Sequence, residues 1–138
     1  MKEDSQTTRT LLLVDDDQNI ISALNRTLRR EGYQILTANS AIDALDLLVR
    51  HPEVEVVLSD QRMPMMTGVE FLRKVKQLYP KTIRMMFSGY TEMESVTSAI
   101  NDGAIFKFLP KPWEDDLLLK NIREAFDYYD VENQRLPL

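Results

Sequence analysis

The chain has 138 residues, no cysteine, a single histidine (His51), and 22 acidic against 17 basic residues, for a formal net charge of −5. This composition excludes disulfides, cysteine–zinc sites, thiol nucleophiles, histidine metal clusters and a Ser-His-Asp triad. The acidic balance argues against broad nucleic-acid binding, and no apolar run approaches the roughly 20 residues that span a bilayer.

Five short apolar runs predict five strands, at 11–14, 33–37, 54–58, 83–87 and 105–109. The first, third and fourth runs are almost continuously apolar, which is typical of central parallel strands buried on both faces. The second run is more mixed and suits an edge of the sheet. Pro110 closes the fifth run, and since proline is tolerated at a sheet edge, we expect the fifth strand at the other edge.

Helix signals follow each of these runs. Apolar residues at a spacing of four predict a helix over 19–30, with Gly32 as its stop. Ser40 precedes the second helix. Two Thr-x-x-Glu capping boxes open the third and fourth helices, Thr67 with Glu70 and Thr91 with Glu94. The fifth helix is expected from about residue 114 towards 134, with acidic residues in its first turn.

The alternation of strands and helices predicts an α/β fold, a (βα)5 doubly wound arrangement with a parallel five-stranded sheet and helices on both faces. The ligand crevice of such a fold lies at the carboxyl ends of the strands. We expect a polar tail at 1–9, the domain at 10–130, and at 131–138 an extension of the last helix or the start of a linker to an absent output domain. The polar first ten residues lack the apolar segment of a signal peptide, so a cytoplasmic location is expected.

Polar side chains follow four of the five predicted strands. They are Asp15, Asp16 and Asp17 after the first, Asp60 after the third, Ser88 after the fourth and Lys111 after the fifth. Carboxylates gathered at one edge repel one another, and a hard divalent cation such as Mg²⁺ removes that conflict. A lysine and a hydroxyl beside the cation suit a phosphoryl group. The pattern therefore predicts a metal-dependent phosphoryl site.

One of these acids could instead be a nucleophile, because a carboxylate can accept a phosphoryl group as an acyl phosphate. Asp60, a single acid at the end of a central strand, is the best candidate. Each residue also has a plain structural explanation: Asp17 as a helix cap, Ser88 as part of a turn, Lys111 as a solvated charge. Coincidences at four different strand ends favour a functional site.

Four segments resemble the receiver domains of two-component response regulators, and the resemblance covers about residues 10–130. They are LLLVDDD at 11–17, VVLSDQRMPMMTGVEFL at 56–72, MMFSGY at 85–90 and FKFLPKPW at 106–113. The second segment is the most specific, because it combines an apolar run, an aspartate, Met-Pro after two further residues, and a glycine four residues beyond the proline. The resemblance implies the flavodoxin-like strand order 2-1-3-4-5.

The resemblance implies a role for each residue of the predicted site. Asp60 would accept a phosphoryl group from a phosphohistidine on a sensor histidine kinase or a phosphotransfer protein. Asp15, Asp16 and Asp60, together with the backbone carbonyl of Arg62, would bind Mg²⁺ or Mn²⁺. No enzyme activity is implied beyond catalysis of the domain's own phosphorylation and dephosphorylation.

Other residues match the family's phosphoryl-contacting and switch positions. Ser88 and Lys111 would bind the phosphoryl oxygens, and the Lys111–Pro112 peptide bond is commonly cis in the family. Ser88 and Phe108 stand at the switch positions. Because Phe108 replaces the tyrosine of many receivers, it would signal by packing rather than through a hydroxyl, or it is an ordinary core aromatic.

Arg62 and Tyr90 stand at positions that line the route to the phosphoryl group. A long cation and an aromatic ring there would change the access of water. We therefore expect Arg62→Ala to alter the rate of autodephosphorylation.

In this family the output surface lies on the fourth helix, the fifth strand and the fifth helix, where a downstream output domain or effector, or a second copy in a homodimer, would bind. The domain itself would bind neither nucleic acid nor membrane. Its motifs are similar to those of receivers attached to cyclic-di-nucleotide phosphodiesterase or ATPase transcription-activator modules. In the fifth helix a stripe of residues either forms a short dimer seam or faces the core: Leu118, Ile122, Ala125 and Tyr129.

A haloacid-dehalogenase-like phosphohydrolase is the alternative. Such enzymes place Asp-x-Asp after the first strand, which would make Asp15 the nucleophile and Asp17 the acid. They also need a second acidic pair after a later strand, and Ser88-Gly89 supplies none. A flavodoxin-like cofactor carrier is disfavoured, because the aspartates after the first strand would repel the cofactor's phosphate.

Overall fold

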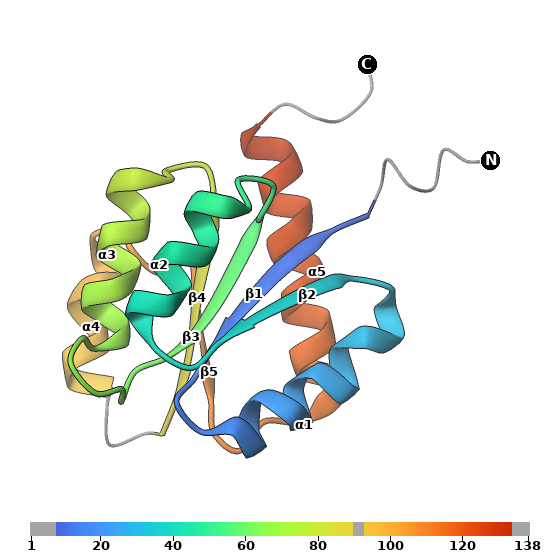
Figure 1. Ribbon diagram of the computed structural model, residues 1–138, viewed down its shortest axis with the longest axis horizontal. Coiled ribbons are helices and arrows are strands. Elements are labelled where there is room, and N and C mark those ends of the chain that lie inside the picture. The colour runs from blue at the N-terminus through green and yellow to red at the C-terminus, as the bar shows by residue number, and fades with distance from the viewer. Residues whose placement is uncertain (1–7, 90–92, 134–138) are drawn as a thin grey trace.

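A single sheet of five parallel strands organises the residues that the computed structural model describes, which are 8–89 and 93–133. The strand order is β2-β1-β3-β4-β5, so the doubly wound fold and its implied order are confirmed (Figure 1). The strands are β1 (Thr10–Val14), β2 (Gln34–Ala38), β3 (Val56–Asp60), β4 (Ile83–Ser88) and β5 (Lys107–Pro110). As expected from their mixed sequence and from Pro110, β2 and β5 are the two edges.

Helices cover both faces of the sheet. They are α1 (Gln18–Leu28), α2 (Ala41–Arg50), α3 (Gly68–Leu78), α4 (Met93–Asn101) and α5 (Asp115–Glu132), with a 3-10 turn, η2 (Arg29–Glu31), after α1. Helices α2, α3 and α4 pack on one face, and α1 and α5 pack on the other (Figure 1). None of the helices within 8–89 and 93–133 is both long enough and apolar enough to cross a bilayer.

The two hydrophobic cores explain why the central strands have no polar side. In β1, Leu12 and Val14 point into the core beneath α2, α3 and α4, whereas Leu11 and Leu13 point into the core beneath α1 and α5. All four side chains have no exposed surface. Because successive side chains of a strand alternate between faces, a strand covered on both sides needs a continuous apolar run.

Two strands begin two residues later than the apolar runs predicted. Val54 is buried in the core but precedes β3, and Ile105 is buried but precedes β5. The amide of Ile105 donates to the carbonyl of Ala99 at 3.2 Å, so it closes the end of α4 instead of pairing with β4. Apolar runs report burial, and burial begins here before the strand hydrogen bonds do.

The helix caps agree with the sequence where the structure describes them. Ser40 Oγ accepts from the amide of Asp43 at 3.0 Å, and Thr67 with Glu70 forms the reciprocal capping box. Gly32 ends the turn after α1 with a positive φ of 81°, which a glycine adopts without steric cost. The predicted box of Thr91 with Glu94 falls outside the described residues.

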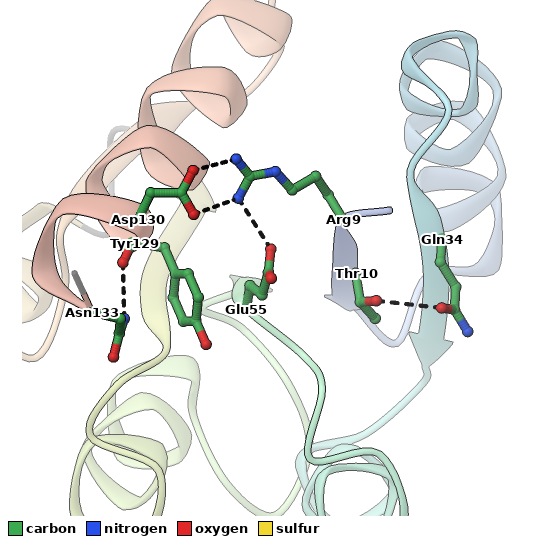
Figure 2. Close-up of polar contacts among 7 residues, drawn as sticks. All are labelled: Arg9, Thr10, Gln34, Glu55, Tyr129, Asp130 and Asn133. Carbon is green, nitrogen blue, oxygen red and sulfur yellow. Dashed lines mark hydrogen bonds and ion pairs between the residues drawn. The ribbon is translucent and has the colours of Figure 1, made fainter. Parts of the chain in front are cut away.

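The amino edge of the sheet carries an ionic cluster that fastens the end of α5 (Figure 2). Arg9 Nη1 donates to Asp130 Oδ1 at 2.9 Å, and Nη2 donates to the second oxygen of the same carboxylate. Arg9 Nη1 also lies 3.4 Å from Glu55 Oε1, and its guanidinium lies 5.2 Å from the centre of the Phe126 ring. We call Arg9, Glu55 and Asp130 the amino-edge clamp.

The apolar stripe of α5 faces the sheet. Leu118, Ile122 and Ala125 are buried in the core beneath α1 and α5, and Tyr129 packs against that core. The core-facing interpretation of this stripe is therefore correct, and its buried side chains do not form a seam for a second chain. The helix ends at Glu132, close to the predicted end.

Candidate functional site

The carboxyl ends of β1, β3, β4 and β5 open into a cleft of about 650 Å³. Its lining comprises Asp15, Asp16, Asp17, Asp60, Arg62, Met63, Pro64, Ser88, Gly89 and Lys111. The four strand ends that carried polar residues in the sequence therefore meet at one place. This convergence follows from the parallel order β1-β3-β4-β5, which aligns the ends of strands that lie far apart along the chain.

Three of these carboxylates lie close enough to share one cation. One oxygen from each of Asp15, Asp16 and Asp60 lies within 4.8 Å of the others. Asp15 is 1% exposed and Asp60 is 5% exposed, whereas Asp16 faces solvent. Oxygen donors that are open to water on one side fit Mg²⁺, which binds carboxylates and keeps several water ligands.

Asp15 is the most electrostatically perturbed of the three acids. Burial, aided by the nearby Asp60 carboxylate, raises its pKa to about 6. The amide of Asp17, which donates to Asp15 Oδ1 at 2.9 Å, and the Lys111 ammonium act against this rise in pKa. A carboxyl group in this state is poised to exchange its proton for a metal ion as the pH rises.

Lys111 stands between the two buried acids. Its Nζ lies 3.0 Å from Asp60 Oδ1 and 3.4 Å from Asp15 Oδ2, and it lies 4.7 Å from the centre of the Phe87 ring. The backbone amide of Lys111 donates to the carbonyl of Ser88 at 2.9 Å, and the Lys111–Pro112 peptide bond is cis. One ammonium group thus faces two carboxylates, which leaves an excess of negative charge in the cleft.

The hydroxyl and the loop residues complete the lining. Ser88 is 2% exposed and ends β4, where it pairs with Pro110 of β5. Arg62 lines the cleft with an exposed side chain. Tyr90, the other residue expected on the access route, lies outside the described residues. Asp17 is the N-cap of α1, because its Oδ1 accepts from the amide of Asn19 at 2.9 Å, as its position before the helix suggested.

Phe108 lies away from the cleft lining. It is half-buried in β5, pairs in register with Met86, and packs against the core beneath α2, α3 and α4. This position suits both interpretations of the residue, because an aromatic ring at the margin of a core can report movement or simply fill space. Its role as a switch stays a prediction.

Two residues hold the loop after Asp60, and sequence reasoning missed one of them, Gln61. Gly68 starts α3 so close to β3 that a Cβ atom on it would lie 2.2 Å from the Asp60 carbonyl oxygen. Gln61 is 6% exposed and binds the first amides of α3. The spacing of Gly68 from the Met-Pro pair was visible in the sequence. Nothing in the sequence indicated that the side-chain amide of Gln61 is buried and hydrogen-bonded and not exposed to solvent.

Comparison with known proteins identifies the family to which the chain belongs. The family model described as the response regulator receiver domain matches residues 11–123. The chain belongs to this family. Among solved structures, the signal receiver domain of an HD-domain-containing protein from Pseudomonas fluorescens Pf-5 superposes with a TM-score of 0.87 at 35% identity, covering 94% of each chain. A CheY-like receiver domain protein from Methanospirillum hungatei gives 0.83 at 29% identity, covering 91% of this chain and 99% of that one.

Curated relatives are larger regulators. The hydrogenase transcriptional regulatory protein HoxA of Cupriavidus necator is 43% identical over 118 residues, which are 86% of this chain and 24% of HoxA. The DNA-binding transcriptional regulator NtrC of Klebsiella pneumoniae is 33% identical over 122 residues, 88% of this chain and 26% of NtrC. The receiver chain therefore spans about a quarter of the length of these relatives.

The phosphohydrolase alternative gains no support from the geometry or the comparisons. That alternative required Asp17 as a catalytic acid, and the Asp17 carboxylate instead caps α1. The end of β4 presents Ser88 and Gly89 to the cleft where such enzymes need an acidic pair. A receiver domain is a phosphorylation-dependent signalling switch, and this chain has the fold and the family membership of one.

Proposed function

We propose that Asp60 is the phosphoacceptor of this receiver, and that the donor is a phosphohistidine on a sensor histidine kinase or on a phosphotransfer protein. The observation that carries the proposal is the position of the Asp60 carboxylate, which lies 3.0 Å from Lys111 Nζ and shares one cleft with Asp15 and Asp16. In the transfer, an oxygen of Asp60 forms a bond to phosphorus while the phosphorus–nitrogen bond of the phosphohistidine breaks. The electron pair leaves with the imidazole nitrogen.

The chain's own groups supply the positioning that such a transfer needs. Asp15, Asp16, Asp60 and the backbone carbonyl of Arg62 would hold Mg²⁺ or Mn²⁺. The positive charge of a bound cation offsets the negative charge of the phosphoryl oxygens and of the attacking carboxylate. Lys111 Nζ lies 3.0 Å from Asp60 Oδ1 and would pair with a phosphoryl oxygen on that carboxylate.

The switch follows from the charge that phosphorylation adds. A phosphoryl group on Asp60 brings strong acceptor oxygens into the cleft, and the Ser88 hydroxyl and the Lys111 ammonium are donors that would bind them. Ser88 ends β4, which precedes α4 in the chain, and Lys111 directly follows β5, so movement of these two donors would alter the α4–β5–α5 surface. Phe108 would follow by repacking in β5. The altered surface would be read by an output domain or effector, or would pair two copies as a homodimer.

The relatives indicate two kinds of output for such a receiver. HoxA and NtrC are named as transcriptional regulators, and the structural neighbour from P. fluorescens belongs to an HD-domain-containing protein. Either kind of output agrees with a receiver that contributes only the switch. We also propose a cytoplasmic location, because histidine kinases use cytoplasmic ATP to form the phosphohistidine that would donate the phosphoryl group.

The test is incubation with Mg²⁺ and a small acyl phosphate, followed by intact-mass measurement. We expect one acid-stable, base-labile phosphoryl group on the wild-type chain and none on Asp60→Asn. The matched control is Asp17→Asn, which changes a cleft-lining aspartate that caps α1 and should still accept the group. Repeated turnover of phosphate esters that survives Asp60→Asn and is lost in Asp15→Asn would instead support the hydrolase.

A further inference from the structure

Gln61, the residue that follows the proposed phosphoacceptor, holds the start of α3 with two hydrogen bonds. Its side-chain Oε1 accepts from the amide of Val69 at 2.9 Å, and its backbone carbonyl accepts from the amide of Gly68 at 2.9 Å. The side chain is buried, so its amide oxygen would lose solvation without this partner. One residue thus satisfies two consecutive amides of the helix from the end of β3.

These bonds are additional to the ordinary cap of the helix. Thr67 Oγ1 accepts from the amide of Glu70 at 3.2 Å, and Glu70 Oε1 accepts from the amide of Thr67 at 2.9 Å. That capping box is local to the helix and lies at the exposed surface. Gln61 directly follows the end of β3, so it connects the helix to the peptide that follows Asp60.

The same peptide is restrained by its neighbours. The Ser59 hydroxyl donates to the Asp60 carbonyl at 2.8 Å, and Gly68 packs directly against that carbonyl oxygen. Residues 62–67 form the loop between the two points that Gln61 joins, and this loop contributes Arg62, Met63 and Pro64 to the cleft. Gln61 therefore closes the loop that forms one wall of the site.

We propose that Gln61 is a positioning residue for the phosphorylation site, an inference that rests on the function proposed above. By tying the start of α3 to the residue after Asp60, its side chain fixes the direction of the Arg62 carbonyl, the expected backbone ligand of the cation. In this role Gln61 would act through the Arg62 carbonyl and not through direct contact with the cation or the phosphoryl group. It acts as the partners of metal ligands do, by orienting a ligand in advance of binding.

The test compares Mg²⁺ affinity in variants that remove each of the two attachments of α3. Gln61→Met and Gln61→Asn remove the bond to Val69, the first by loss of the acceptor and the second by loss of reach. Gln61→Glu keeps an acceptor oxygen at the same distance along the side chain. Thr67→Val is the matched control, because it removes a side-chain bond to the same helix away from the cleft.

Mg²⁺ binding is measured by calorimetry and by the fluorescence of Trp113, the only tryptophan, whose ring lies 6.1 Å from that of Phe87. We expect both loss variants to bind Mg²⁺ about tenfold or more weakly, as the loss of a partner that orients a metal ligand does. Gln61→Glu should restore tight binding, and Thr67→Val should bind as the wild type does. At saturating Mg²⁺ the rate of phosphorylation should recover, because only the orientation of a ligand has been lost.

Wild-type Mg²⁺ affinity in both loss variants would overturn the proposal, and so would an equal loss of affinity in Thr67→Val. The binding measurement does not depend on phosphoryl transfer. If the wild-type chain binds Mg²⁺ but accepts no phosphoryl group, the proposed function fails while the role of Gln61 is still decided by the titrations.

Discussion

Charged side chains are paired differently at the two ends of the sheet. At the carboxyl edge, Asp15 and Asp60 are buried together with Lys111 as their shared cation, and Asp16 adds a further negative charge. At the amino edge, Arg9 is matched by a bidentate carboxylate and a second acid (Figure 2). Each edge sets one cation against two carboxylates, but the carboxyl edge adds the Asp16 carboxylate, whereas at the amino edge Asp130 binds both Nη1 and Nη2 of Arg9. The contrast indicates that the fold holds one end firmly and leaves the other poised for ligands.

The direction of the pKa shifts shows the same contrast. Burial raises the pKa of Asp15 to about 6, so its charged form is disfavoured where it stands. The hydrogen bond to Asp130 raises the pKa of Arg9, so its charged form is favoured. Removing a charge should therefore stabilise the chain at the carboxyl edge and destabilise it at the amino edge.

Asp15→Asn gives the largest expected effect. A pKa of about 6 against an ordinary value of 3.8 means that, between these two pH values, the folded state binds more protons at Asp15 than the unfolded chain does. The free energy of unfolding contributed by this group therefore falls as the pH rises through that window, by about 3 kcal/mol in total. Urea unfolding without metal should show Asp15→Asn more stable than wild type by about 2–3 kcal/mol at pH 7.5 and equal to it near pH 3.5.

The same variant should lose the response to Mg²⁺. Addition of the ion should stabilise the wild-type chain at pH 7.5 and leave Asp15→Asn unchanged, because a carboxylate ligand has been removed. Asp43→Asn, at an exposed acid in the first turn of α2, is the control for a generic change in charge. A variant that is less stable than wild type at pH 7.5 would show that the cleft is balanced without a cation.

Breaking the amino-edge clamp should have the opposite sign. Arg9→Met keeps the apolar stem but removes the guanidinium that binds the carboxylates of Glu55 and Asp130, and Glu55 is 6% exposed. We expect a loss of about 2 kcal/mol in the free energy of unfolding, as for other buried acids that lose a charged partner. Arg29→Met, at an exposed arginine in η2, should change stability little.

A phosphorylation assay distinguishes the role of the amino-edge clamp from the role of the phosphorylation site. Arg9→Met should accept the phosphoryl group to the wild-type extent in the presence of Mg²⁺, since the clamp lies at the other end of the strands from Asp60. Equal stability of Arg9→Met and wild type, measured by urea unfolding, would contradict the view that this edge holds the fold. A large loss of phosphoryl acceptance in a folded variant would show that the two ends are coupled.

The sequence predicted the carboxyl edge better than the amino edge, and the reason is physical. Asp15, Asp60 and Lys111 each follow an apolar run directly, and the parallel fold brings such positions together whatever the details of packing. The clamp joins Arg9 to Asp130 across 121 positions of sequence, at residues that follow no local pattern. Its geometry depends on the length and direction of α5, which periodicity does not determine.

The loop after Asp60 was predicted from the sequence only in part. Its glycine was visible in the sequence as a spacing, because a close approach of backbone to backbone demands one residue type at one position. The bond from Gln61 to Val69 was not visible, since many side chains can follow an aspartate and only the fold shows which amide lies within reach. The acids that line the cleft could therefore be predicted, and the hydrogen bonds that hold the loop behind them could not.

The smallest expected effect on stability comes from Arg62→Ala. The Arg62 side chain is exposed at the rim of the cleft, so its loss should change the free energy of unfolding by less than about 0.5 kcal/mol. The backbone carbonyl at this position is kept, so metal binding should also persist. What should change is the rate of autodephosphorylation, because a long cation at the cleft rim alters how water approaches a phosphoryl group on Asp60.

The measurement is a single-turnover assay of the loss of phosphoryl group, with wild type and Arg62→Lys as controls. Arg62→Lys keeps a cation on a flexible stem and should lie nearer to wild type than Arg62→Ala does. An unchanged rate in Arg62→Ala would remove this residue from the control of water access. A changed autodephosphorylation rate with an unchanged free energy of unfolding would group Arg62 with the charged residues of the carboxyl edge, which act on the phosphoryl group. It would distinguish Arg62 from the amino-edge clamp, whose charges stabilise the fold.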